Sequence, residues 1–214
     1  MEEKKVCQNN ATLVGTLVGD FDVDHTFLGE KFYRNYISVR RTSGAVDVLP
    51  IIVSEKLLDK TVGVSGNRVM INGRVSTYNT NNEDGKRSLK IYIFATYYSA
   101  GEDVEGLEDA NQVTLSGYLC KPPIYRETPL GRQIADFILA VNRPYGKSDY
   151  IPCICWGRNA VWMSGFEVGE EVFVSARFQS RNYVKKQPDE TLVDKVAYEF
   201  STIALSVGLE GEEE

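Results

Sequence analysis

The sequence predicts an all-β protein built from two five-stranded barrels in tandem. Three observations support this: an internal repeat of about a hundred residues, short strand-like segments separated by Gly and Pro, and a short helical segment at a fixed place in the repeat. A repeat of this length is far longer than the 20–50 residues typical of solenoids and propellers, so it indicates a duplicated domain.

The first half of the chain aligns with the second at an offset of 102 positions, without a gap between residues 9–58 and 111–160. The clearest match sets residues 12–17 (TLVGTL) against residues 114–119 (TLSGYL). After one inserted residue, the region around Gly66 and Arg74 matches that around Gly169 and Arg177. We therefore divide the chain into a first repeat (1–101), an acidic linker (102–109), a second repeat (110–209) and an acidic tail (210–214).

The second repeat shows the strand pattern most clearly. Alternating or β-branched segments predict strands at 113–119, 135–141, 150–156, 171–180 and 196–205, with a helix at 158–163. Five strands with a helix between the third and the fourth is the OB-fold arrangement, and we expect it in both repeats. In that fold the face of strands two and three, with the 1–2 and 4–5 loops, holds oligonucleotides.

Composition narrows the classes of protein. No apolar stretch reaches the roughly 18 residues that cross a membrane, and the charged N-terminus lacks a secretion signal, so we expect a cytoplasmic protein without a membrane partner. Cys7, Cys120, Cys153 and Cys155 are expected to be reduced and structural. With His25 as the single histidine and Cys153 too close to Cys155 for a zinc motif, we predict no metal and no cofactor.

The net charge of −6 is unevenly distributed. Its excess acid lies in the 102–109 linker and the 210–214 tail, which leaves both barrels near neutral. A polyanionic ligand would therefore have to be held by more than charge alone.

Strand alternation separates inward from outward side chains in the second repeat. Side chains that fit a barrel interior share one face of strands three and four: Ile151, Cys153, Cys155, Val172, Val174, Ala176 and Phe178. The outward face, which also takes Ile154, combines with the preceding loop to present rings and cations: Tyr145, Tyr150, Trp156, Tyr183, Arg143, Lys147, Arg177 and Arg181. We place Lys185 and Lys186 in the 4–5 loop, where they could clamp a strand. Such a surface can stack unpaired bases, at about 1–3 kcal/mol per base.

A structural interpretation competes with this one. A single outward Tyr is usually a cross-strand packing residue, and Trp156 could pack under the helix or in a subunit interface. Lys185 and Lys186 could simply be solvated. Four rings clustered with arginines favour the binding surface over these alternatives.

Five segments of the second repeat resemble bacterial single-stranded DNA-binding proteins: 117–119 (GYL), 130–132 (LGR), 137–143 (FILAVNR), 155–160 (CWGRNA) and 179–183 (QSRNY). The resemblance covers 110–208. It implies non-enzymatic, sequence-tolerant binding of single-stranded DNA in replication, recombination and repair. It also implies stacking by four aromatics, which fall on Tyr145, Tyr150, Trp156 and Tyr183, with Tyr at three positions where the family typically has Trp or Phe. The family usually works as four barrels, which implies a homodimer of this two-barrel chain.

The first repeat is aromatic-poor at the corresponding positions, which are Ser43, Val48, Ser54 and about Thr80. It does carry other residues that could contact a nucleic acid: Arg34, Arg40, Arg41, Tyr78, Lys86 and Arg87. We predict that this repeat serves mainly in assembly or spacing, with weak phosphate contacts. It is similar in this respect to primosomal replication proteins, which bind through basic residues.

Three alternatives remain open at this stage. The ligand could be RNA, since contacts to the 2′-OH cannot be read from a protein sequence. The chain could be a primosomal-type accessory or a protein-interaction module, a function that suits the first repeat better than the second. An enzyme such as a nuclease is disfavoured, because Asp136 and Asp149 look isolated and no G-x-x-x-x-G-K-[ST] motif occurs.

Overall fold

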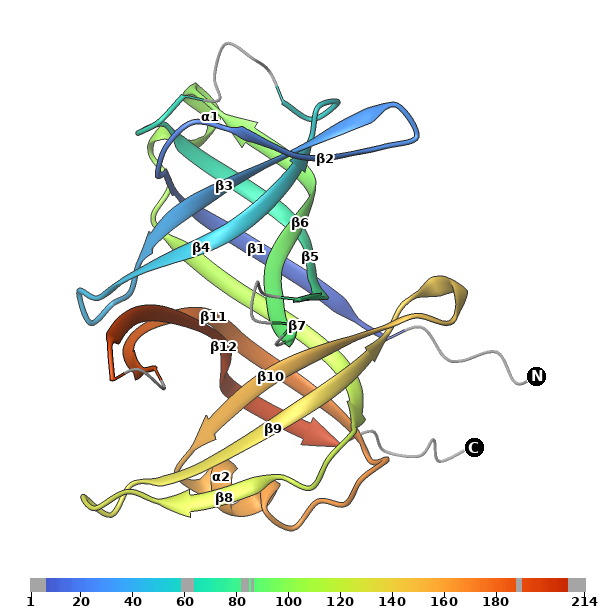
Figure 1. Ribbon diagram of the computed structural model, residues 1–214, viewed down its shortest axis with the longest axis vertical. Helices are drawn as coiled ribbons and strands as arrows, with labels where there is room; N and C mark the ends of the chain where they lie inside the picture. The colour runs from blue at the N-terminus through green and yellow to red at the C-terminus, as the bar shows by residue number, and fades with distance from the viewer. Residues whose placement is uncertain (1–6, 59–63, 82–84, 86, 188–189, 208–214) are drawn as a thin grey trace.

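The computed structural model describes residues 7–58, 64–81, 85, 87–187 and 190–207. Its strands form one hydrogen-bonded sheet that curls into two barrels, with the first barrel above the second in Figure 1. The all-β prediction of two tandem OB-type barrels is confirmed. The predicted acidic tail, 210–214, lies outside the described residues.

The first barrel contains β1 (Asn9–Leu17), β2 (Asp22–Phe27), β3 (Glu30–Arg40), β4 (Val46–Ser54), β5 (Arg68–Asn81) and β6 (Arg87–Ala100). It closes because β1 pairs with both β5 and the end of β3, while β4 and β6 pair in parallel. The second barrel repeats this plan with β7 (Ala110–Leu119), β8 (Ile124–Glu127), β9 (Gln133–Asn142), β10 (Ser148–Trp156), β11 (Glu171–Lys186) and β12 (Leu192–Val207).

Two features of the strand prediction were incomplete. Each barrel has one additional strand, β2 or β8, which forms a hairpin with the next strand. All four residues of β8 are exposed, so no alternation of burial marks it in the sequence. The β11–β12 hairpin is also longer than predicted, with pairing from Val172↔Val207 to Lys186↔Leu192. Lys185 and Lys186 therefore end a strand, and their placement in a loop was wrong.

The predicted helix is α2 (Arg158–Met163), which follows β10 after Gly157, a glycine at a φ of 58°. Ala160 and Met163 of α2 are buried against the barrel. The corresponding positions in the first repeat are 56–61, of which 59–61 lie outside the described residues. Glu55–Leu57 form a turn there.

Part of the acidic linker packs on the first barrel. Residues Glu102–Glu105 form a single helical turn, α1, with Val104 fully buried against β5 and β6. Asp109 forms an ion pair with Arg68 at 2.6 Å and accepts a hydrogen bond from the Arg40 amide at 2.5 Å. Some of the local acidity is therefore neutralised by the first barrel.

The predicted core of the second barrel is confirmed, since all seven inward residues are buried. Cys7 is also buried, and Cys120, Cys153 and Cys155 are free thiols. Ile154 was predicted to face outward and is only 5% exposed. It lies where β10 is flanked on both sides, by β9 at Asp136 and by β12 at Ser201, so neighbouring strands cover it.

The barrels are joined edge to edge. Strands β1 and β7 pair antiparallel from Asn9↔Leu115 to Val14↔Ala110. The β5–β6 hairpin of the first barrel reaches β10, and the β11–β12 hairpin of the second reaches β4 (Figure 1). Each barrel thus extends one hairpin over its neighbour.

Two buried aspartates hold these hairpins in place. Asp149, fully buried on β10, accepts hydrogen bonds from the Thr77 amide at 2.6 Å and the Thr77 hydroxyl at 3.0 Å. Its counterpart Asp47 on β4 accepts one from the Ser180 amide at 2.8 Å. Asp149 thus has its hydrogen-bond partner Thr77 in the other repeat, at a separation of 72 positions. We call these two contacts the cross-barrel clasps.

Within the described residues, no helix is both long and apolar enough to cross a bilayer.

Candidate nucleic-acid interface

Three of the four predicted stacking residues have exposed side chains on the outer surface of the second barrel. Tyr150 and Trp156, on the outward face of β10, are 51% and 43% exposed, and Tyr183 near the end of β11 is 38% exposed. The buried residues Ile151 and Cys155 alternate with the two β10 rings, so burial of the core turns those rings to solvent. Tyr145 lies in the 3-10 turn Pro144–Gly146, and its side chain lies outside the described part of the structure.

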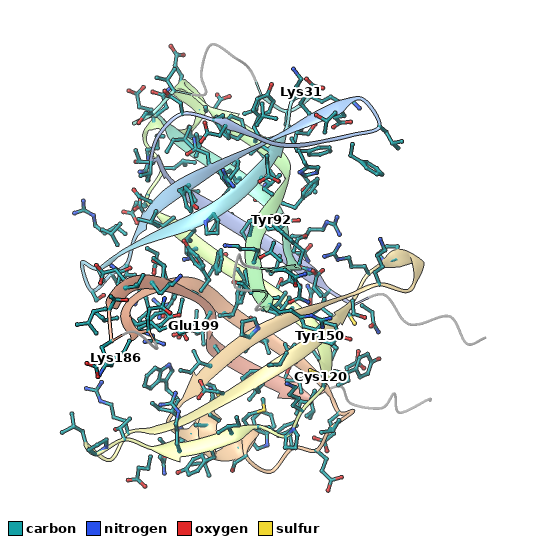
Figure 2. All side chains as sticks on the ribbon, in the orientation of Figure 1. Lys31, Tyr92, Cys120, Tyr150, Lys186 and Glu199 are labelled. Carbon is teal, nitrogen blue, oxygen red and sulfur yellow. The ribbon has the colours of Figure 1, made fainter. Side chains whose placement is uncertain are left out.

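The rings do not form one compact cluster. Trp156 ends β10 next to α2, whereas Tyr150 lies near the other end, where its amide donates a hydrogen bond to the Thr77 hydroxyl of the first barrel. Figure 2 labels Tyr150 on β10 below the first barrel and Lys186 at the opposite side of the molecule, on the β11–β12 hairpin. A ligand that touched all the rings would therefore follow an extended path over the outer surface of the second barrel.

The predicted cations differ in their exposure and in the contacts that their charged groups make. Arg181 lies with its guanidinium carbon 5.9 Å from the Tyr183 ring centroid, in cation–π geometry. Lys147 and Lys185 are exposed, and Lys186 forms an i,i+4 pair with Glu190 at 3.1 Å. Arg177 is half-buried, and within the described part of the chain its Nε has no hydrogen-bond partner.

Arg143 is occupied by a structural contact. Its guanidinium forms an ion pair with the buried Asp149 carboxylate and donates to the Thr77 carbonyl oxygen at 3.4 Å. The hydrogen bond to Asp149 raises the pKa of Arg143, which keeps it charged. Arg143 therefore holds the clasp, and any contact that it makes with a ligand would compete with Asp149.

Tyr183 and Lys185 face the first barrel. They line a groove of about 780 Å³ between the barrels, together with residues of β3–β6 and of β12. Prediction from the sequence missed three further tyrosines in this groove: Tyr36, Tyr92 and Tyr198. The alternation in β3, where Tyr36 precedes the buried Ile37, was the signal that could have found the first of them.

Three phenols of this groove, those of Tyr78, Tyr92 and Tyr198, stay neutral over the physiological pH range. Burial raises the pKa of Tyr198 to about 12 and also raises the pKa of Tyr78 and Tyr92. A neutral phenol adds no charge repulsion toward phosphate, and it can both stack and donate a hydrogen bond.

The second barrel is similar in sequence to proteins of one known family. Residues 110–203 match the Single-strand binding protein family. Single-stranded DNA-binding protein A of Bacillus subtilis (strain 168) is 38% identical over 96 residues, which are 42% of this chain and 56% of that protein. Single-stranded DNA-binding protein 1 of Staphylococcus aureus (strain COL) is 37% identical over 93 residues, with 40% and 56% covered. The matched segment thus spans little more than half the length of these curated relatives.

The two-barrel architecture also has a counterpart of known structure. The crystal structure of the wild-type single-stranded DNA binding protein from Thermus aquaticus superimposes with a TM-score of 0.78 at 19% sequence identity. The match covers 98% of this chain and 97% of that one. Both barrels and their tandem arrangement are therefore a known fold.

Proposed function

We propose that this chain, whose second barrel matches the single-strand binding protein family, binds single-stranded DNA without strong sequence preference. The observation that carries the proposal is the set of exposed rings, Tyr150, Trp156 and Tyr183, at positions where the resemblance implies stacking on bases. Binding by these rings does not depend on the base sequence, because every base can stack on an aromatic side chain.

The binding mode combines stacking with a modest electrostatic component. We expect Lys147, Lys185 and Arg181, which are exposed, and the half-buried Arg177 to contact phosphates beside the rings. Because the barrels are near neutral, we expect a shallow dependence of affinity on salt, set by the few phosphates that these cations neutralise. No catalytic step is part of this proposal.

The proposal extends to the protein's setting. We propose a cytoplasmic protein that protects single strands during replication, recombination and repair, with the second barrel as the main stacking surface and the first in assembly with weaker contacts. We further propose a homodimer that presents four barrels. Sedimentation should then give a mass near twice the 24.0 kDa of the chain, and a monomer at all micromolar concentrations would contradict it.

Fluorescence quenching tests the site directly. The chain has two tryptophans, so the titration should use a Trp162→Phe background, in which Trp156 is the single reporter. Oligo-dT should quench Trp156 strongly, and added salt should weaken binding. Competition between matched DNA and RNA oligonucleotides in the same assay identifies the preferred sugar.

Substitutions then assign the residues. Measured by anisotropy, Trp156→Ala and Tyr183→Ala should each weaken binding by about 5- to 150-fold, which corresponds to the loss of one stacked base. Tyr97→Ala is the matched control, because Tyr97 is 46% exposed on β6 of the first barrel and does not line the groove. A folded double variant of Trp156 and Tyr183 with wild-type affinity would overturn the assignment.

A further inference from the structure

The groove between the barrels carries a second set of exposed rings. Its walls come from β3–β6 of the first barrel and from the β11–β12 hairpin of the second. Five tyrosines line it: Tyr36, Tyr78, Tyr92, Tyr183 and Tyr198. Tyr36 and Tyr78 are 38% and 42% exposed, as open to solvent as Tyr183. Figure 2 labels Tyr92 on β6, above Tyr150 of the second barrel.

The ring arrangement suits an unpaired base better than a packed core. Tyr78 meets Tyr92 edge to face, with centroids 5.7 Å apart and an interplanar angle of 66°. Tyr92 is the more buried of the two, so it supports Tyr78 from one side while Tyr78 keeps solvent-accessible surface. A ring held in this way loses little conformational entropy when a base stacks on it.

The groove is also positively charged. Among the described residues, five cations line it, Arg34, Arg87, Lys90, Lys185 and Lys195, against one acid, Asp24. Asp24 lies 3.6 Å from Arg34 and so offsets that one cation. For the other four, no ion pair is formed with any carboxylate in the described ranges. Uncharged rings beside cations form a surface that attracts a polyanion whose bases have apolar faces.

The cross-barrel clasps hold both walls of this groove. The Thr77 amide, which donates to Asp149, directly precedes Tyr78. The Ser180 amide, which donates to Asp47, lies three residues before Tyr183. Each wall is therefore anchored to the opposite barrel by a buried carboxylate, so the groove exists before any ligand arrives.

We propose that this groove is a second binding surface for single-stranded nucleic acid, in which Tyr36, Tyr78 and Tyr183 stack bases, while Arg87 and the lysines that line the groove contact phosphates. The proposal rests on the function proposed above and deepens it. Tyr183 belongs to both surfaces, so one strand can pass from the second barrel onto the first. The first barrel then binds through tyrosines at positions other than Ser43, Val48, Ser54 and Thr80.

The test compares short and long oligonucleotides on the full chain. A double variant, Tyr36→Ala with Tyr78→Ala, should leave quenching of Trp156 by an oligo-dT of about 8 nucleotides unchanged, since one OB-fold takes about 4–16 nucleotides. Its affinity for an oligo-dT of about 30 nucleotides should fall at least tenfold, because two stacked bases are lost. Tyr36→Phe with Tyr78→Phe should restore long-oligonucleotide affinity, since the rings remain, and Tyr97→Ala is the unaffected control.

Photocrosslinking gives an independent measurement on the unmodified chain. A long oligonucleotide that contains 5-iodo-deoxyuridine should form adducts at Tyr36 or Tyr78 as well as in the second barrel. If the double alanine variant is folded and binds both lengths like the wild type, and no adduct maps to the groove, this inference is overturned. In that case a loss of binding in Trp156→Ala leaves the proposed function standing, whereas wild-type binding by Trp156→Ala as well removes both.

Discussion

The two barrels share their interior and their clasps and differ on their outer surface. Arg41 pairs with Asp47 in the first barrel as Arg143 pairs with Asp149 in the second, and each aspartate binds the opposite hairpin. On the outer face, Tyr150 and Trp156 of β10 correspond to Val48 and Ser54 of β4. Closure and mutual docking require equivalent contacts in both copies, here the Arg–Asp pairs, whereas the positions of the outward rings differ between the copies.

The cores illustrate the same rule at finer detail. Leu49, Ile51 and Val53 of β4 occupy the places that Ile151, Cys153 and Cys155 take in β10, and all six are buried. Apolar side chains of similar size replace one another there, since packing demands volume more than identity.

Removing a clasp has the largest expected effect on stability, and it tests whether the two barrels depend on each other equally. Asp149→Ala leaves Arg143 and the Thr77 amide without their buried partner, so we expect the free energy of unfolding to fall by about 3 kcal/mol. Asp47→Ala should cost a similar amount, because Asp47 is equally buried and faces Ser180 in the same way. Urea denaturation measures both.

A solvent-exposed pair offers the matched control for the clasps. Asp136→Ala breaks a pair with Arg126 in which both side chains are exposed, and it should cost less than about 1 kcal/mol. If one clasp variant lost no more stability than this control, the two barrels would not depend on each other symmetrically.

Two equivalent glycines test how tightly each barrel closes. An alanine Cβ at Gly117 would lie 2.8 Å from the Ala140 carbonyl oxygen, and one at Gly15 would meet the Ser38 carbonyl oxygen more closely still. We expect each Gly→Ala change to destabilise by about 1–3 kcal/mol, with the larger loss at Gly15. Thermal unfolding should show this order, and Gly106→Ala, where no atom lies within 4 Å, should change little.

An aromatic can be added to the first barrel to narrow the difference between the outer faces. Val48 is 37% exposed, and its amide hydrogen bond to the Ser180 hydroxyl does not involve the side chain. Val48→Tyr should tighten binding of long oligonucleotides by about fivefold, the lower end of the gain from one stacked base. Val23→Tyr, on the exposed strand β2, should leave the anisotropy titration unchanged. Equal gains in affinity from both variants would mean that a ring anywhere on the surface of the first barrel tightens binding.

Thiol reactivity gives the smallest expected effect. Burial raises the pKa of Cys155 to about 12 and raises that of Cys153 as well, so near pH 8 the Cys155 thiolate is about three orders of magnitude scarcer than for a free thiol. The half-buried Cys120 should react first with an aromatic disulfide reagent, and Cys120→Ser should remove that phase. Cys7 and the β10 cysteines should react only on unfolding. Rapid labelling of Cys153 in the native protein would show that β10 opens without global unfolding.

Local patterns in the sequence accounted for the elements that depend on near neighbours. The repeat placed two barrels, the alternation in β10 placed Tyr150 and Trp156 outside, and the segment after Gly157 placed α2. The solvent-exposed β8 left no such pattern, because alternation appears only where one face of a strand is buried.

By itself, then, the sequence determined the duplicated barrel and the inside or outside position of most residues in the second copy, because burial follows the two-residue period of a strand. Only the tertiary structure decided that Arg143 is held by Asp149, that Tyr183 faces the first barrel, and that Tyr36 and Tyr78 share its groove. These contacts join residues from opposite repeats, at separations such as the 133 positions between Asp47 and Ser180. No periodicity along the chain encodes them, because they arise from the docking of the two barrels.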